Sequence, residues 1–321
     1  MAEKKRSPRN RTLYVSKEET KKLSQQLFHY SGEKTLSIKD FRNKTILGDS
    51  LVVLKAIPNE SFNLIILDPP YNLDKDFNGF KFKSSNDQKY IEYLESWFIE
   101  VVRTLKPNGS LYLCGDWKNS ATLYFVMQRH LHVLNRITWQ REKGRGAKSN
   151  WKNSMEDIWF GVKNKSDYYF NVDAVKLKRK VLAPYKVDGK PKDWEESKDG
   201  NFRLTFPSNF WDDITVPYWS MPENTDHPTQ KPEKLIAKLI LASSKEGDLV
   251  FDAFLGSGTT SVVAKKLKRN YVGIEFNLEY AAISQKRLNK VESDKSIQGY
   301  SNGVFWERNT LAAQKKLKKK N

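Results

Sequence analysis

One short segment constrains this chain more than any other: an apolar run that ends in an acidic, proline-rich turn. Residues 62–67 read Phe-Asn-Leu-Ile-Ile-Leu, a pattern typical of a buried strand, and Asp68-Pro69-Pro70-Tyr71 follows directly. The two prolines have no backbone N–H, so the carbonyls of this turn are left to accept hydrogen bonds from another group. With the Asp68 carboxylate and the flat Tyr71 ring, they would suit a planar ligand that carries an amino group. A proline-stiffened surface turn is an equally good interpretation of these four residues alone.

A second apolar run leads into a glycine-bearing turn. Residues 249–251 read Leu-Val-Phe; Asp252 follows, and Gly256-Ser257-Gly258 precedes a segment with apolar residues at helical spacing. Glycines let a backbone approach a ligand closely, and a helix start presents unpaired amides. The turn is not a Walker A loop, and Ser261 stands where a dinucleotide fingerprint has its third glycine. Glu275 ends the next strand-like run, about 20 residues on, where an acid commonly binds ribose hydroxyls. The pattern indicates a nucleoside-containing cofactor.

Taken together, these motifs resemble those of the S-adenosylmethionine-dependent amino-methyltransferases, which modify exocyclic amines of DNA bases. The resemblance covers roughly residues 44–290, and its motifs are Gly48-Asp49, Asp68–Tyr71, His227–Pro232, Phe251–Gly258 and Glu275. The catalytic motif precedes the cofactor turn, as in the permuted subgroup called the β class. The resemblance implies an α/β fold: a three-layer sandwich around a largely parallel seven-stranded methyltransferase sheet, with circularly permuted motif order and a target-recognition insert.

The resemblance also implies a role for each matched residue. Asp68 and the Pro69 carbonyl would accept the amino protons of the base, beside Pro70, and Tyr71 would stack on the flipped base. The residues that it implies for S-adenosylmethionine are Asp49, Thr229, Lys231, Asp252, Phe254, Gly256, Ser257, Gly258, Thr259 and Glu275. Among these, Glu275 would accept from the ribose hydroxyls and Asp49 from the adenine amine, whereas Lys231 and Thr229 would lie near the methionine carboxylate. The alternatives are helix capping for Asp49, a surface role for Glu275 and a rigid capping loop for residues 227–232.

The charge of the chain favours a polyanionic partner, which we expect to be double-stranded DNA. Lys and Arg number 56 against 38 Asp and Glu, a net charge of +18, and the excess is clustered: residues 141–192 hold 14 basic and 6 acidic residues. Trp151 could stack on a base, but we favour packing for it. The basic residues expected to contact DNA are Arg141, Lys143, Arg145, Lys148, Lys178, Arg179 and Lys180.

Changes of pattern along the chain divide it into five parts. Strand-like and helix-like segments alternate through residues 45–163 and 223–290, which predicts the catalytic and cofactor-binding halves of one domain. Residues 164–222 lose clear periodicity and are the expected target-recognition insert. Residues 1–44 form a basic N-terminal arm, and residues 291–321 form a basic C-terminal tail.

Several local elements are expected within these parts. The capping-box pattern at Ser16 predicts a helix from about residue 16 to 30, either a DNA-facing arm or, as we favour, a packed appendage. In the permuted fold, the strand before Gly48 would lie next to the strand that ends at Glu275. Further expectations are a mobile loop at 73–89, a helix at 90–105 ended by Pro107–Gly109, a strand at 110–114, and a strand pair at 133–140 and 156–163.

The single cysteine limits the chemistry and the location. Cys114 lies in a strand-like run and is expected to pack in the core; one cysteine permits neither an internal disulfide nor a cysteine-based metal cluster, and no metal is expected. With no transmembrane-length apolar run and no signal-peptide pattern, we expect a cytoplasmic bacterial protein.

The remaining question is which group accepts the methyl group. Family members with Asp in the first position of the catalytic motif mostly resemble adenine-N6 enzymes, so Asp68 predicts adenine over cytosine N4. The same chemistry on RNA or on a protein amide, and a non-catalytic DNA-binding partner that keeps the fold, are the alternatives. The resemblance also allows a homodimer and a cognate restriction endonuclease as partners.

Overall fold

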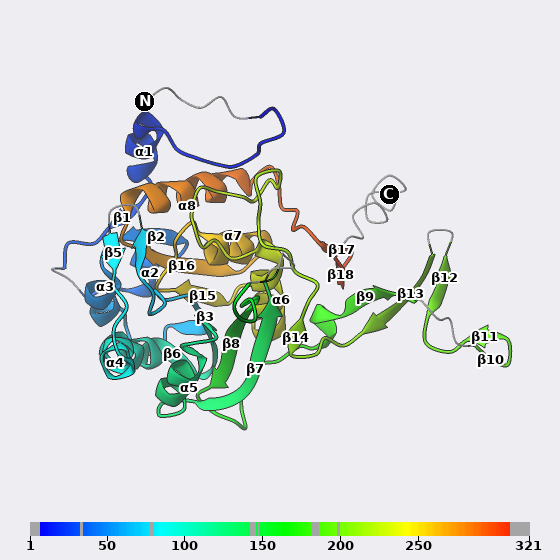
Figure 1. The fold of residues 1–321 in the computed structure, drawn as a ribbon. Coiled ribbons are helices and arrows are strands. Elements are labelled where there is room, and N and C mark those ends of the chain that lie inside the picture. The colour runs from blue at the N-terminus through cyan, green and yellow to red at the C-terminus, as the bar shows by residue number, and fades with distance from the viewer. Residues whose placement is uncertain are drawn as a thin grey trace.

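A nine-stranded sheet runs through the centre of the protein (Figure 1). The computed structural model describes residues 7–32, 35–77, 80–141, 146, 148–181, 186–197 and 200–308. In spatial order the strands are β1 (Phe28–His29), β2 (Lys44–Leu47), β16 (Asn270–Glu275), β15 (Leu249–Asp252), β3 (Phe62–Leu67), β6 (Leu105–Asp116), β8 (Met155–Val162), β7 (His132–Gln140) and β14 (Phe210–Trp211).

The order and direction of these strands confirm the expected sheet. The first six are parallel to one another, whereas β8 is antiparallel to both β6 and β7. Seven strands have four or more residues, and the two-residue strands β1 and β14 extend this core at its edges. β2 pairs with β16 in the expected position, with Leu47 opposite Glu275.

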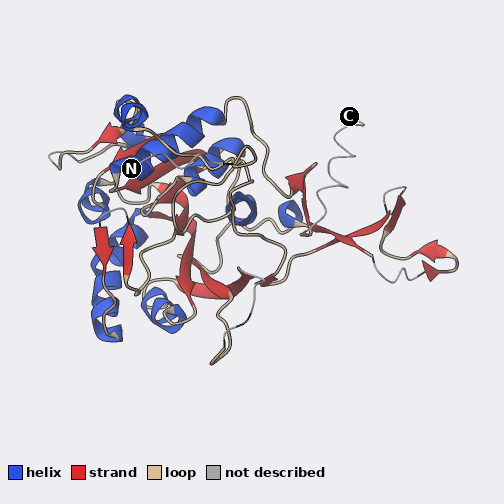
Figure 2. Cartoon of the chain, turned by 45° about the horizontal axis from the view of Figure 1, so that its top comes forward, coloured by secondary structure: helices blue, strands red, loops and turns tan. Residues whose placement is uncertain are grey.

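Helices cover both faces of the sheet, which gives the expected three layers (Figure 2). Successive side chains of a strand point to opposite faces. Leu64 and Ile66 of β3 therefore share one core with α6 and α7, while Ile65 and Leu67 share the other with α3, α4 and α5. The helices are α1 (Lys17–Ser24), α2 (Ile38–Phe41), α3 (Ser50–Ala56), α4 (Asp87–Thr104), α5 (Ser120–Met127), α6 (Glu233–Ser243), α7 (Thr259–Lys266) and α8 (Leu278–Lys290).

A second sheet forms an arm that projects from the main body (Figures 1 and 2). Its order is β12-β13-β9-β18-β17, and a β10–β11 hairpin lies near its tip. β18 comes from the segment assigned to the tail, yet it pairs with β9, with Phe305 opposite Leu177. The strands of this sheet and hairpin are β9 (Leu177–Lys180), β10 (Lys186–Val187), β11 (Lys190–Pro191), β12 (Glu195–Ser197), β13 (Gly200–Thr205), β17 (Tyr300–Ser301) and β18 (Val304–Trp306). The short helix η1 (Asp173–Val175) precedes β9 and contacts α6.

Some local expectations were wrong. Pro107–Gly109 does not end the preceding helix, because α4 ends at Thr104 and these residues lie inside β6, where the pairing with β3 shifts register. A proline is tolerated at such an irregularity, since the ladder hydrogen bond that it cannot donate is already interrupted. The loop expected at 73–89 contains a hairpin of β4 (Lys75–Phe77) and β5 (Phe80–Phe82).

The first helix is shorter than expected. α1 ends at Ser24, and its Glu19 forms an ion pair of 2.7 Å with Lys286 of α8, so the helix is packed against the main body. Among the residues that the structure describes, no helix is long and apolar enough to cross a membrane.

Candidate active site

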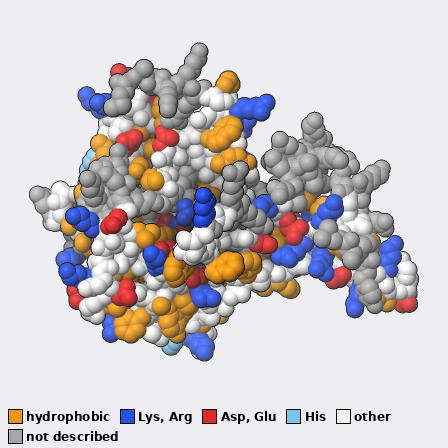
Figure 3. Space-filling model, viewed as in Figure 1, with side chains coloured by type: hydrophobic (Ala, Val, Ile, Leu, Met, Phe, Trp, Pro, Cys, Tyr) orange, Lys and Arg blue, Asp and Glu red, His pale blue; other side chains and the backbone are white. Residues whose placement is uncertain are grey.

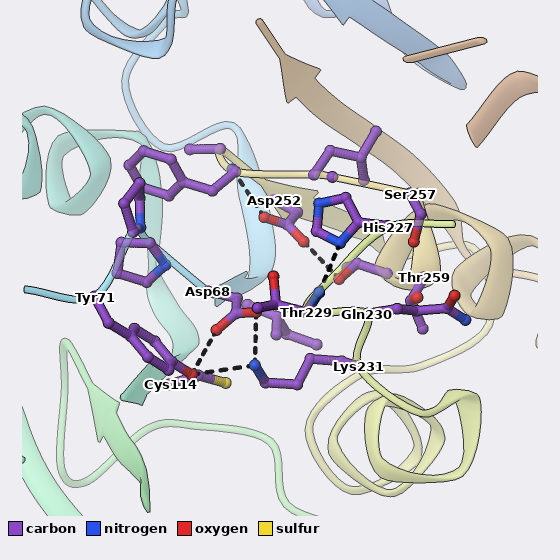
Figure 4. Close-up of a pocket in the computed structure, with 18 of the residues that line it drawn as sticks. Asp68, Tyr71, Cys114, His227, Thr229, Gln230, Lys231, Asp252, Ser257 and Thr259 are labelled. Atoms are coloured by element: carbon purple, nitrogen blue, oxygen red, sulfur yellow. Dashed lines mark hydrogen bonds and ion pairs between the residues drawn. The ribbon is translucent and has the colours of Figure 1, made fainter. Parts of the chain in front are cut away.

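The acidic residues of the two motifs meet at one edge of the central sheet. Asp68 follows β3, Asp252 ends β15, Glu275 ends β16, and Asp49 follows β2. The carboxyl ends of parallel strands lie at the same edge, which is where open α/β sheets bind ligands. All four residues line one cavity of about 790 Å³, part of which is drawn in Figure 4.

A compact ion-pair cluster holds Asp68. Lys231 Nζ lies 2.6 Å from Asp68 Oδ2 and 3.1 Å from the Tyr71 hydroxyl, which itself donates to Asp68 Oδ1 at 2.8 Å (Figure 4). The turn is fixed from behind, because the Tyr90 hydroxyl donates to the Pro70 carbonyl at 3.1 Å. Lys231, expected beside a methionine carboxylate, therefore lies against the predicted catalytic carboxylate in the same cavity.

Glu156 joins this cluster and was missed by the sequence analysis. Its Oε2 lies 3.2 Å from Lys231 Nζ, and its Oε1 lies 3.0 Å from Arg141 Nη1. Its side chain is 6% exposed. The acidic pair Glu156-Asp157 at the start of a predicted strand is a signal, but the antiparallel pairing of β8 with β6 is needed to bring it to Asp68.

Burial and charge set the protonation states in the cluster. Burial lowers the pKa of Lys231, but the charges of Asp68 and Glu156 outweigh this effect and leave the pKa above its usual value. Burial, reinforced by the same two carboxylates, raises the pKa of Tyr71 well above its usual value. Lys231 is therefore an ammonium and Tyr71 a neutral hydroxyl donor. The Cys114 thiol is buried as expected, lines the cavity, and has its pKa raised chiefly by burial.

The other end of the cavity carries two buried carboxylates. Asp252 accepts from the Phe254 amide at 2.9 Å and from the Thr260 hydroxyl at 2.6 Å. Glu275 accepts from the Gly256 amide at 2.7 Å and from the Asn277 amide at 2.8 Å. Burial raises the pKa of Asp252 to about 7 and that of Glu275 to about 7. Both can therefore change charge near neutral pH when a ligand adds hydrogen-bond donors.

The glycine turn leaves no room for larger residues. Gly256 and Gly258 both have positive φ, at +55° and +87°. A Cβ on Gly256 would lie 2.9 Å from His227 Nε2, and one on Gly258 would lie 2.2 Å from Ser284 Oγ. Arg287 supports the turn from the core, donating to the Ser257 carbonyl at 2.9 Å. Its partners are Thr259 Oγ1 at 3.0 Å and Glu233 Oε1 at 3.0 Å.

Most of the predicted site residues gather here. Besides the residues above, Pro69, Thr229, Phe254, Ser257 and Thr259 line the cavity, whereas Gly258 does not. Asp49 also caps α3, since its carboxylate accepts a hydrogen bond from the Leu51 amide at 2.9 Å. Helix capping was the alternative role considered for this residue.

The predicted DNA contacts are more dispersed. Arg141 lines the cavity, Lys148 and Lys180 are exposed, and Lys143 and Arg145 lie outside the described residues. Lys178 lies over the Trp306 ring at 5.2 Å and Arg179 lies 3.8 Å from Glu307, so both also hold β9 against the last strand. Figure 3 shows Lys and Arg side chains along the projecting arm.

The expectation that Trp151 packs was wrong. Its side chain is 96% exposed, because residues 148–154 leave the sheet between β7 and β8. An exposed ring next to basic residues can stack on a base, which was the other interpretation of this residue.

The sheet order, the strand-end carboxylates and the glycine turn define an α/β enzyme of the methyltransferase type. Residues 62–286 match the family model for DNA methylases that act at N6 or N4. The chain belongs to this DNA methylase family.

Two curated relatives and one solved structure illustrate the likeness. The chain is 37% identical over 252 residues to the DNA adenine methyltransferase YhdJ of Escherichia coli, covering 76% of this chain and 82% of that one. It is 34% identical over 247 residues to the Type II methyltransferase M.HpaI of Haemophilus parainfluenzae, covering 76% and 74%. The structure of the cytosine-N4-specific PvuII DNA methyltransferase shares the fold, with a TM-score of 0.56, 21% identity, and coverage of 78% and 90%.

Proposed function

We propose that this DNA methylase transfers a methyl group from S-adenosylmethionine to the N6 amine of adenine in duplex DNA. The observation that carries the proposal is the shared cavity: the Asp68–Tyr71 turn lies at one end, and Asp252, the glycine turn and Glu275 lie at the other. Kinship with a named adenine methyltransferase supports adenine over cytosine.

The residues at the second end fit the cofactor. Gly256 and His227 both line the cavity, and a Cβ on Gly256 would clash with the His227 ring, so a glycine is needed for the two to lie side by side against a bound ligand. Glu275 would accept from the ribose hydroxyls and Asp49 from the adenine amine, while Asp252 and the turn would surround the methionine portion. When bound, S-adenosylmethionine supplies an electrophilic methyl group on a positively charged sulfur.

The first end supplies the orientation that amine methylation needs. The exocyclic amine shares its lone pair with the ring and is a poor nucleophile. Asp68 and the Pro69 carbonyl would each accept a hydrogen bond from one of its two N–H groups. These bonds would turn the lone pair toward the methyl group for in-line attack. Asp68 would stabilise the positive charge that the base nitrogen gains with the methyl group, until the extra proton passes to solvent.

The base must leave the duplex to reach this cavity, where Tyr71 would stack on it. The Tyr71 hydroxyl is already tied to Asp68 at 2.8 Å, so the ring and the carboxylate are oriented together. Arg141, Lys143, Arg145 and Lys148 would bind phosphates around the flipped base, together with the basic residues of the projecting second sheet.

The proposal is tested by expressing the chain in bacterial cells that lack DNA methylation. Digested genomic DNA is then analysed by mass spectrometry for N6-methyladenine and N4-methylcytosine, and the modified sites are sequenced. We expect N6-methyladenine at a defined sequence; N4-methylcytosine, or methylation of RNA alone, would contradict the assignment.

Three finer points belong to the same proposal. A DNA substrate supports a location in the bacterial cytoplasm. The likeness to a Type II methyltransferase supports a cognate restriction endonuclease as a partner that shares the target sequence. A homodimer would be detected by sedimentation with and without duplex DNA.

A further inference from the structure

We propose that Glu156 is a positioning residue that sets the charge around Asp68, and that DNA binding releases it from Arg141. The inference rests on the proposed function, because it concerns the same base-amine site. Four charged side chains form the path: Arg141, Glu156, Lys231 and Asp68, joined by contacts of 3.0, 3.2 and 2.6 Å.

The charges of these four groups cancel as the structure stands. Lys231 lies directly on Asp68, so the positive charge of the ammonium offsets the carboxylate that is expected to orient the base. Glu156 adds a second negative charge, and Arg141 offsets that in turn. Without Arg141, the other three groups carry a net charge of −1.

A net negative charge is what the reaction requires. The amine nitrogen becomes cationic as the methyl group arrives, and a neighbouring ammonium that is not fully offset would disfavour it. Lys231 and Glu156 are 8% and 6% exposed, so their charges are poorly screened by solvent. Glu156 therefore provides the negative charge that Lys231 would otherwise remove from the base pocket.

Glu156 also gives Lys231 an alternative partner. An ammonium has three donors, and Lys231 Nζ already reaches Asp68, Tyr71 and Glu156. A small movement toward Glu156 frees Asp68 Oδ2 to accept a base amine. This movement is easier when Glu156 has no second cation to neutralise it.

Arg141 is placed to respond to DNA. Its side chain is 37% exposed, whereas that of Glu156 is buried, and it begins the basic stretch at residues 141–150. A phosphate is a strong bidentate partner for a guanidinium and competes with the carboxylate. A phosphate that draws Arg141 away leaves Glu156 free to neutralise Lys231 at the moment the base enters.

The test separates binding from chemistry in three variants. Single-turnover methyl transfer at saturating duplex and cofactor gives the rate of chemistry, and fluorescence anisotropy gives duplex affinity. Glu156→Gln keeps the shape but removes the charge, and we expect about 100-fold slower transfer with duplex affinity unchanged or tighter. Glu156→Asp keeps the charge and should recover part of that rate. Arg141→Gln should weaken duplex binding. The KM for duplex should therefore increase, while the saturated rate should stay close to that of the wild type.

A matched control is the neighbouring carboxylate. Asp157 is also buried, but it accepts from Ser120 at 2.6 Å and Thr138 at 2.8 Å and does not line the cavity. Asp157→Asn should lower thermal stability while leaving the saturated rate within about threefold of wild type. This variant shows what the loss of a buried charge on β8 does without contact with Lys231.

The outcomes distinguish this inference from the proposed function. If the wild-type protein methylates adenine and the Glu156→Gln rate is within about twofold of wild type, this inference is wrong and the proposed function still stands. Equal losses of saturated rate in Glu156→Gln and Arg141→Gln would also overturn it, because a purely structural pair predicts that result. Absence of adenine methylation by the wild-type protein would contradict the proposed function and this inference together.

Discussion

Replacing Gly258 by alanine should destabilise the protein and weaken cofactor binding together. Gly258 precedes α7 with φ of +87°, and an added Cβ would lie 2.2 Å from Ser284 Oγ, 2.6 Å from Ser284 Cβ and 2.9 Å from Ser284 Cα. Rotating the hydroxyl relieves only the first contact. α7 and α8 would have to separate, which moves the turn that carries Gly256.

The expected loss can be built from two contributions. A left-handed backbone costs a residue with a Cβ about 1–2 kcal/mol. Forcing an extra carbon into packed structure costs about 1–3 kcal/mol. We therefore expect Gly258→Ala to lower the free energy of unfolding by about 2–5 kcal/mol, the sum of these two ranges. Urea unfolding followed by circular dichroism measures it, and calorimetry gives the cofactor dissociation constant.

Gly247→Ala is the matched control. Gly247 has a similar φ of +84°, but nothing lies within 4 Å of its added Cβ, and it does not line the cavity. It should lose only the backbone contribution, about 1–2 kcal/mol, and keep cofactor affinity. If Gly258→Ala is no more destabilising than Gly247→Ala, the packing of α7 against α8 at this position is not what the structure indicates.

Three further predictions concern the buried carboxylates, the support of the glycine turn and the exposed Trp151. Because burial raises the pKa of Asp252 and Glu275 to about 7, the cofactor-free protein should lose stability as pH rises from about 4 through 7. Binding should favour the ionised forms, so cofactor affinity should increase from pH 6 to 8, with a smaller increase in Glu275→Gln; calorimetric affinity that is flat with pH would contradict this. Arg287→Leu leaves Glu233 with Lys266, at 2.6 Å, as its ion-pair partner, and removes the hydrogen bonds that Arg287 donates to Ser257 and Thr259. It should cost about 1.5–3 kcal/mol in urea unfolding, whereas a loss under about 1 kcal/mol would refute a supporting role. Trp151→Ala should leave the melting temperature unchanged but weaken duplex binding by about 1–3 kcal/mol in anisotropy, and unchanged binding would argue against stacking.

The main architecture could be predicted from the sequence because it depends on short-range patterns. Phe62–Leu67 is apolar apart from Asn63, and residues 249–251 are apolar and lead into Asp252; each segment became a buried parallel strand with an acid at its carboxyl end. The pairing of β2 with β16 followed from the permuted motif order and not from local propensity. That pairing brings two segments together that are distant in the chain.

The features that could not be predicted from the sequence depend on tertiary contacts. Glu156 reaches Lys231 only because β8 runs antiparallel beside β6, and nothing near it in sequence indicates that neighbour. Arg287 lies on a helix whose pattern is that of a surface helix, yet its guanidinium is 3% exposed under the glycine turn. The arm strand β18 pairs with β9 across more than a hundred residues, so the segment looks like a tail in sequence.

The most direct test of the central claim compares the wild-type protein with Asp68→Ala. Both are incubated with duplex DNA and isotopically labelled S-adenosylmethionine, and nucleosides are quantified by mass spectrometry while duplex binding is measured in parallel. We predict labelled N6-methyladenine with the wild-type protein, and loss of transfer with retained duplex binding in Asp68→Ala. Methyl transfer that survives the substitution would contradict the role of Asp68 as the acceptor that orients the base amine.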